Sequence, residues 1–256
     1  MPDLSIFNPA DIWPFLLAGF AAQMVDGALG MAFGVISSTL LVSVLGVPPA
    51  QASAGVHLAE VFTTGASGLS HAWHRNIDWK LFGKLVVPGV LGGILGAYVL
   101  SSIDAGIARP LVMAYLAVIG LMLLYRAWRF PSPQFEDARI VAPLGVAGGF
   151  LDAAGGGGWG PVVTSNLLIQ GSEPRKTIGT VSASEFFLTV SISVTFILTL
   201  GFEAFTNATV GLLIGGVLAA PFGALLAKNV KPRVLLLMVG TVLTVTSAYS
   251  IYKALA

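Results

Sequence analysis

The sequence contains no cysteine, and only 10% of its 256 residues are charged. The missing cysteine excludes disulfides and cysteine-based metal sites. Soluble domains carry roughly 25% charged residues, and a nucleic-acid-binding surface needs a basic patch that this chain lacks. Apolar residues make up 55% of the chain, and its mean hydropathy is +0.87. The composition therefore predicts an all-α integral membrane protein, surrounded by the lipid bilayer and without a nucleic-acid partner.

Polar residues, glycines and prolines divide the apolar chain into ten predicted helices. Six of them are long enough to span a bilayer, which takes roughly 20 residues. Four are short, with about 14 to 16 residues. The ten segments are 12–27, 31–45, 50–73, 79–101, 107–128, 139–154, 158–170, 174–200, 207–227 and 232–254.

The short segments recur as a pair at the start of each half of the chain. Aligning the halves places Asp26 on Asp152 and Glu60 on Glu185, although the chain has only twelve acidic residues. The same alignment pairs Gly30 with Gly156 and Gly34 with Gly160. We therefore expect two repeats, residues 1–130 and 131–256, each a short hairpin (12–45 or 139–170) followed by three spans.

Each predicted repeat has five segments, and an odd number inserts the second repeat upside down. The positive-inside rule gives the orientation. With the N-terminus outside, 11 of the 13 basic residues fall on the cytoplasmic side, and only Arg109 and Lys253 are external. We therefore expect a multi-pass protein of the bacterial inner membrane with both termini external. The eleven are Arg75, Lys80, Lys84, Arg126, Arg129, Arg139, Arg175, Lys176, Lys228, Lys231 and Arg233.

Glycines interrupt both hairpins at their tips, in "QMVDGALGMAFG" and "GGFLDAAGGGGWG". Short, glycine-interrupted segments at matching places in two inverted halves indicate a transporter's binding site. The helix that follows a break exposes N–H groups that bind anions, although glycines can also serve tight helix packing. The candidate substrate-binding residues are Gly30, Gly34, Ser37, Ser38, Gly155, Gly156, Gly157, Gly158, Thr164, Ser165 and Asn166.

Ionisable residues inside a membrane are costly and usually functional. A carboxylate facing an anion must be protonated or paired, which favours coupling of transport to protons. The alternative is that these groups cap broken helices or bond across helices. The candidates are Asp26, His57, Glu60, Asp152 and Glu185.

Two other functions fit fragments of the sequence. "GASG", Gly65 to Gly68, resembles the motif of intramembrane serine proteases, with Ser67 as the nucleophile. A nucleophile needs an oriented base, and His71 on the same helix has no evident third partner. A divalent-metal permease would use His57, Glu60 and the aspartates, but the sequence has no dense ligand cluster. We expect neither an enzyme nor a bound cofactor or metal.

The two hairpin regions resemble the sulfite exporter TauE/SafE family of membrane permeases. The second copy, "GGFLDAAGGGGWGPVVTSNLLIQGSEPRKTIGTVSASEF", is the closer match, and the resemblance covers both halves. It implies export of a small anion such as sulfite or a sulfonate. In the first copy Ala28 and Leu29 replace tip glycines, and His57 stands where the second half has a serine. The second hairpin is therefore expected to make more of the anion contacts. The oligomeric state stays open, with a homodimer as one option.

Overall fold

The computed structural model describes residues 9–29, 31–129, 138–170, 172–202, 207–229 and 232–255. In this part of the chain the regular structure is entirely helical, which confirms the all-α membrane class. The elements are α1 (Pro9–Leu29), α2 (Phe33–Thr39), the π-helical turn η2 (Leu40–Val44), α3 (Pro49–Trp73), α4 (Trp79–Ser102), α5 (Ala105–Trp128), α6 (Ala142–Gly155), the π-helical turn η3 (Gly160–Thr164), α7 (Ser165–Ile169), α8 (Pro174–Leu200), α9 (Asn207–Asn229) and α10 (Pro232–Leu255).

One predicted boundary differs in a way that affects the first hairpin. The segment expected at 12–27 is the 21-residue helix α1, which runs from Pro9 past Asp26 to Leu29. Proline is tolerated in the first turn because its missing N–H would be unpaired there. Asp26 accepts hydrogen bonds from beyond the helix, so it does not end α1. The first hairpin therefore has one long arm and one short arm, not two short arms.

The outer surface of the helices is apolar, as lipid contact requires. Among the described residues, three helices are long and apolar enough to cross a membrane: Trp79–Ser102, Ala105–Trp128 and Lys176–Leu200. Trp73, Trp79 and Trp128 are exposed at helix ends, where tryptophans mark the membrane interface. Shorter apolar stretches occur in the hairpins, in α9 and in α10.

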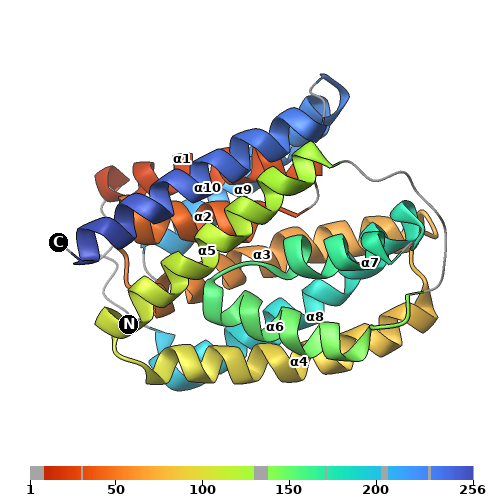
Figure 1. Ribbon diagram of the computed structural model, residues 1–256, viewed down its shortest axis with the longest axis horizontal. Helices are drawn as coiled ribbons and strands as arrows, with labels where there is room; N and C mark the ends of the chain where they lie inside the picture. The colour runs from red at the N-terminus through yellow and green to blue at the C-terminus, as the bar shows by residue number, and fades with distance from the viewer. Residues whose placement is uncertain are drawn as a thin grey trace.

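Helix pairs pack closely through glycines. α1 packs on α9, α6 on α4, α3 on α8, and α5 lies beside α10 (Figure 1). A methyl group on Gly149 of α6 would lie 3.0 Å from the Gly93 nitrogen of α4. On Gly19 of α1 it would lie 2.7 Å from the Leu212 Cα of α9. Small residues let membrane helices approach this closely, and this packing holds α1 and α6, which lead into the two breaks.

Candidate functional site

The second break depends on glycine at three consecutive positions. α6 ends at Gly155, and the chain then passes through Gly156, Gly157 and Gly158 with φ values of 73°, 142° and 152°. Residues that carry a side chain rarely adopt these backbone angles, so only glycine fits here without strain. The Gly157 N–H donates to the Asp152 carbonyl at 2.8 Å and closes the end of α6. The run of four glycines is thus explained mainly by backbone geometry.

Asp152 holds the two sides of this break together and ties them to α3. Its Oδ1 accepts a hydrogen bond from the Trp159 backbone N–H at 2.7 Å. Its Oδ2 lies 3.0 Å from His57 Nε2, and both side chains are buried. His57 Nδ1 lies 2.7 Å from the carbonyl oxygen of Ser53, one turn earlier on α3. The carboxylate therefore bridges the hairpin and a spanning helix.

Asp26 has the corresponding position in the first break. Its Oδ1 accepts hydrogen bonds from the Ala32 N–H at 2.7 Å and the Phe33 N–H at 3.1 Å. Phe33 begins α2, so this carboxylate occupies the N–H groups at the start of the helix after the break. In both breaks, therefore, an aspartate accepts hydrogen bonds from backbone N–H groups that were expected to bind a substrate anion.

The two breaks touch each other. A methyl group on Gly34 would lie 2.9 Å from the Gly157 Cα, and one on Gly160 would lie 2.6 Å from the Met31 Cβ. The Ser38 hydroxyl donates to the Gly156 carbonyl. Residues more than 100 positions apart thus form one buried junction, which we call the break junction: Met31–Ser38 and Gly156–Gly160.

The carboxyl groups of α3 and α8 gather at the break junction. Glu60 accepts from the Gly34 N–H, and its Oε2 is buried with no partner in the described chain. Asp26, Asp152 and Glu185 all interact electrostatically with Glu60. The predicted proton-coupling residues therefore lie close to one another: Asp26, His57, Glu60, Asp152 and Glu185.

The candidate substrate-binding residues differ in burial and in their partners. Ser37 is fully buried, and its hydroxyl has no partner within the described residues. Thr164 and Ser165 are also buried, whereas Asn166 is exposed and donates to the Val162 carbonyl at 3.3 Å. Gly30 lies outside the described residues. The structure thus brings the glycines and Ser38 together and leaves Asn166 at the surface.

Sequence reasoning missed two residues of α5 that reach the hairpins. The Tyr115 hydroxyl donates to the Gly157 carbonyl at 3.1 Å. The Arg126 guanidinium donates to the Ser165 hydroxyl and lies 3.6 Å from the Met31 sulfur. In the sequence, Tyr115 lies within a predicted spanning helix and Arg126 near the end of the same helix, and nothing assigned either residue to the hairpins. Only the polar character of Tyr115 in an apolar run was a signal, and Arg126 was counted as a topological charge.

The protease and metal alternatives gain no support from side-chain geometry. The Ser67 hydroxyl accepts a hydrogen bond from Ser182 at 2.7 Å, and His71 pairs with Asn76 instead of Ser67. In the described ranges no group of three or more His, Asp or Glu side chains is arranged to hold a metal ion.

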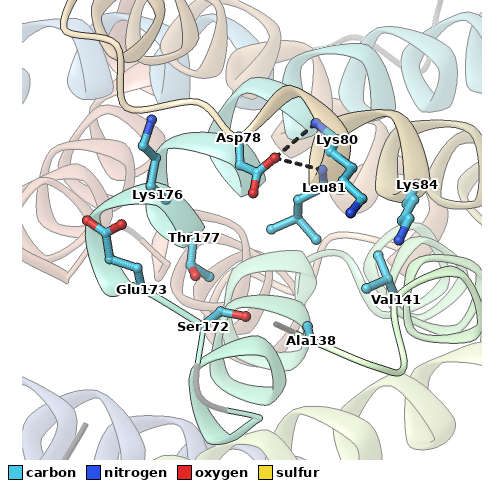
Figure 2. Close-up of a pocket in the computed structure, with 10 residues that line it drawn as sticks. All are labelled: Asp78, Lys80, Leu81, Lys84, Ala138, Val141, Ser172, Glu173, Lys176 and Thr177. Carbon is cyan, nitrogen blue, oxygen red and sulfur yellow. Dashed lines mark hydrogen bonds between the residues drawn. The ribbon is translucent and has the colours of Figure 1, made fainter. Parts of the chain in front are cut away.

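A separate pocket lies where α4 and α8 begin, and none of its lining residues belongs to the break junction (Figure 2). Its volume is about 180 Å³, and Lys80, Lys84 and Lys176 are among its lining residues. Figure 2 shows Lys80 and Lys84 extending from one side of α4, while Lys176 points away from them. Lys176 donates to the Arg75 carbonyl at 2.9 Å. The pocket is hydrophilic and lies at one end of the bundle.

Comparisons with known proteins cover nearly the whole chain. The family model for "Sulfite exporter TauE/SafE" matches residues 15–250. "Probable membrane transporter protein YtnM" of Bacillus subtilis (strain 168) is 42% identical over 242 residues, which are 91% of this chain and 80% of the relative. No solved structure matches the chain. The matched residues include both breaks and all five ionisable candidates.

Proposed function

Because this chain belongs to the sulfite exporter TauE/SafE family of membrane transporters, we propose that it is a secondary transporter that exports a small oxyanion. Sulfite or a sulfonate is the favoured substrate, since the family model is described as a sulfite exporter. The observation that carries the proposal is the convergence of two helix breaks at one buried junction. Broken helices at matching places in two halves are a typical transporter site.

We propose that, when no substrate is bound, the protein's own carboxylates accept the hydrogen bonds that a bound substrate anion accepts in their place. The N–H groups of Ala32, Phe33 and Trp159 donate to Asp26 and Asp152, and Gly34 donates to Glu60. An entering anion competes for the same donors. Exchange of one acceptor for another keeps these buried N–H groups paired, which matters because an unpaired buried donor costs about 1–3 kcal/mol.

Proton coupling follows from the crowding of negative groups. Glu60, Glu185, Asp26 and Asp152 interact electrostatically, and the His57 Nε2 lies 3.0 Å from the Asp152 Oδ2. An anion enters such a neighbourhood more readily when one carboxyl carries a proton, because like charges repel strongly where water is scarce. Glu60 is the favoured proton carrier, since its Oε2 has no partner in the described chain.

The contacts also support two inverted repeats. Gly34 and Gly160 are equivalent positions, 126 residues apart, and so are Met31 and Gly157. Gly34 contacts Gly157, and Gly160 contacts Met31, so the two contacts are equivalent as well. Asp26 caps the chain at Phe33 as Asp152 caps it at Trp159. We propose that residues 1–130 and 131–256 are related in this way and that the hairpins enter from opposite sides. The lysine-lined pocket would then lie on the cytoplasmic side, where it attracts anions.

The test is transport by purified protein in liposomes. Efflux of ³⁵S-labelled sulfite, and separately of ³⁵S-labelled methanesulfonate, is measured with and without an imposed pH gradient, for the wild type and for Glu60→Gln and Glu185→Gln. Asp104→Asn, which changes an exposed carboxylate at the start of α5, is the matched control. We expect sulfite efflux driven by the pH gradient, with the pH response reduced in Glu60→Gln and Glu185→Gln only. Absence of sulfite and sulfonate transport by the wild type contradicts the proposed substrate class, and an unchanged pH response in both variants contradicts the coupling role.

A further inference from the structure

The Arg126 side chain connects the two hairpins. It lies in the last turn of α5, and its Nη1 donates to Ser165, the first residue of α7. The same nitrogen lies 3.6 Å from the sulfur of Met31, in the first break. Met31 packs on Gly160, five residues before Ser165. One half-buried guanidinium therefore lies where the first and second hairpins meet.

Helix geometry explains how a residue near the end of α5 reaches this place. Side chains lean toward the N-terminus of their helix. A long side chain in the last turn of α5 is thus directed back along the helix, toward the breaks. Arg129, three residues later, is exposed and has no such contact among the described residues.

Arg126 has no carboxylate partner in the described part of the chain. The ion pair found there joins His57 to Asp152. Arg109, another arginine of α5, donates to the Val42 carbonyl and leaves its buried Nε without a partner in the described chain, but it lies near the other end of α5 from the break junction. For Arg126, the hydrogen bonds within the described ranges all come from Nη1, so Nε and Nη2 have no acceptor there. A guanidinium has five N–H groups in a planar fork. Removing such a cation from water is unfavourable unless an anion or other acceptor compensates.

The break junction itself leaves few donors for a substrate. Its N–H groups at Ala32, Phe33, Gly34 and Trp159 donate to the protein's own carboxylates. Arg126 is therefore the positively charged donor beside the junction that keeps unused hydrogen-bonding capacity.

We propose that Arg126 is the cationic ligand of the transported anion and that it selects for oxyanions. Two oxygens of a sulfite or sulfonate head group accept parallel N–H bonds from the guanidinium fork, which a single-atom halide does not do. The inference rests on the proposed function and adds the residue that recognises the substrate. It assigns Arg126 a role in binding instead of only in membrane topology.

The experiment measures binding of sulfite, methanesulfonate and chloride to the full-length protein in detergent by calorimetry. Arg126→Gln should weaken binding of both oxyanions by about 10- to 100-fold, the range for loss of a charged hydrogen bond. Arg126→Lys keeps the charge but loses the fork, so the preference for sulfite over chloride should fall. Arg129→Gln, one turn away and exposed, is the matched control and should bind as the wild type does.

Three outcomes separate the two proposals. If the wild type binds sulfite or methanesulfonate and Arg126→Gln binds them equally well, Arg126 is not a ligand while the proposed function stands. If the wild type binds neither oxyanion, both proposals are wrong. If Arg126→Gln does not fold, as judged by gel filtration, Arg126→Lys decides, and an unchanged preference for sulfite over chloride overturns the inference.

Discussion

Gly34 and Gly157, which are 123 residues apart, meet backbone to backbone. A methyl group on Gly34 would lie 2.9 Å from the Gly157 Cα and 3.0 Å from the Glu60 Oε1. The contact joins the two hairpins, and the Glu60 carboxyl group lies beside Gly34. It explains why glycine is required in the first break even though φ there is not positive among the described residues.

Gly34→Ala should therefore destabilise the protein and impair transport. Forcing a methyl group into a packed interior typically costs about 1–3 kcal/mol. Gly83→Ala on α4 is the matched control, because a methyl group there meets nothing within 4 Å. Thermal unfolding in detergent should show a lower Tm for Gly34→Ala only. Equal Tm values for the two variants would mean that the breaks do not touch in this way.

The pair of His57 and Asp152 should behave as a coupled unit. His57→Ala leaves the buried Asp152 carboxylate without its side-chain partner, whereas in the Asp152→Asn background the remaining group is an uncharged amide. The loss of stability caused by His57→Ala should thus be smaller in that background, by about 1 kcal/mol or more. Chemical unfolding of the wild type, both single variants and the double variant measures the coupling. Simple additivity would show that the contact contributes nothing.

Tyr115→Phe should loosen the second break by a modest amount. The hydroxyl donates to the Gly157 carbonyl, and a neutral hydrogen bond contributes about 1 kcal/mol. The exposed Tyr98 of α4 supplies the control, since Tyr98→Phe removes a hydroxyl at the lipid-facing surface. Chemical unfolding should separate the two variants. A Tyr98→Phe effect as large as that of Tyr115→Phe would argue against a specific role for the bond.

The orientation of the chain can be tested with single cysteines, because the natural sequence has none. Lys80 and Ser102 are both exposed and lie at opposite ends of α4. In intact cells a membrane-impermeant maleimide should label Ser102→Cys and should label Lys80→Cys only after the membrane is permeabilised. The reverse pattern would invert the proposed topology.

The sequence alone predicted the class of protein, the family and most helix boundaries. These features depend on local composition and spacing: a run of apolar residues defines a helix in lipid, and glycine or proline interrupts it. The resemblance to the TauE/SafE family was confirmed by the family match. The aligned aspartates Asp26 and Asp152 also turned out to have the same kind of contact, each accepting from the chain seven residues further on.

The extent of α1 was less predictable. The sequence predicted a helix over 12–27, in which Asp26 comes one residue before the end. Within the folded chain it instead accepts from Ala32 and Phe33, so the helix continues to Leu29. The partner of a polar group, and not the residue type, decided where the helix ends.

By itself, then, the sequence determined a membrane-embedded helical chain with two glycine-rich breaks and a small set of ionisable residues within its apolar segments. Only the tertiary structure decided that the breaks meet, that Asp26, Glu60 and Asp152 occupy the N–H donors, and that Arg126 of α5 lies between the hairpins. The physical reason is the range of the interactions. Helix formation and interruption are set by neighbouring residues, whereas these contacts join parts of the chain that only the packing of whole helices brings together.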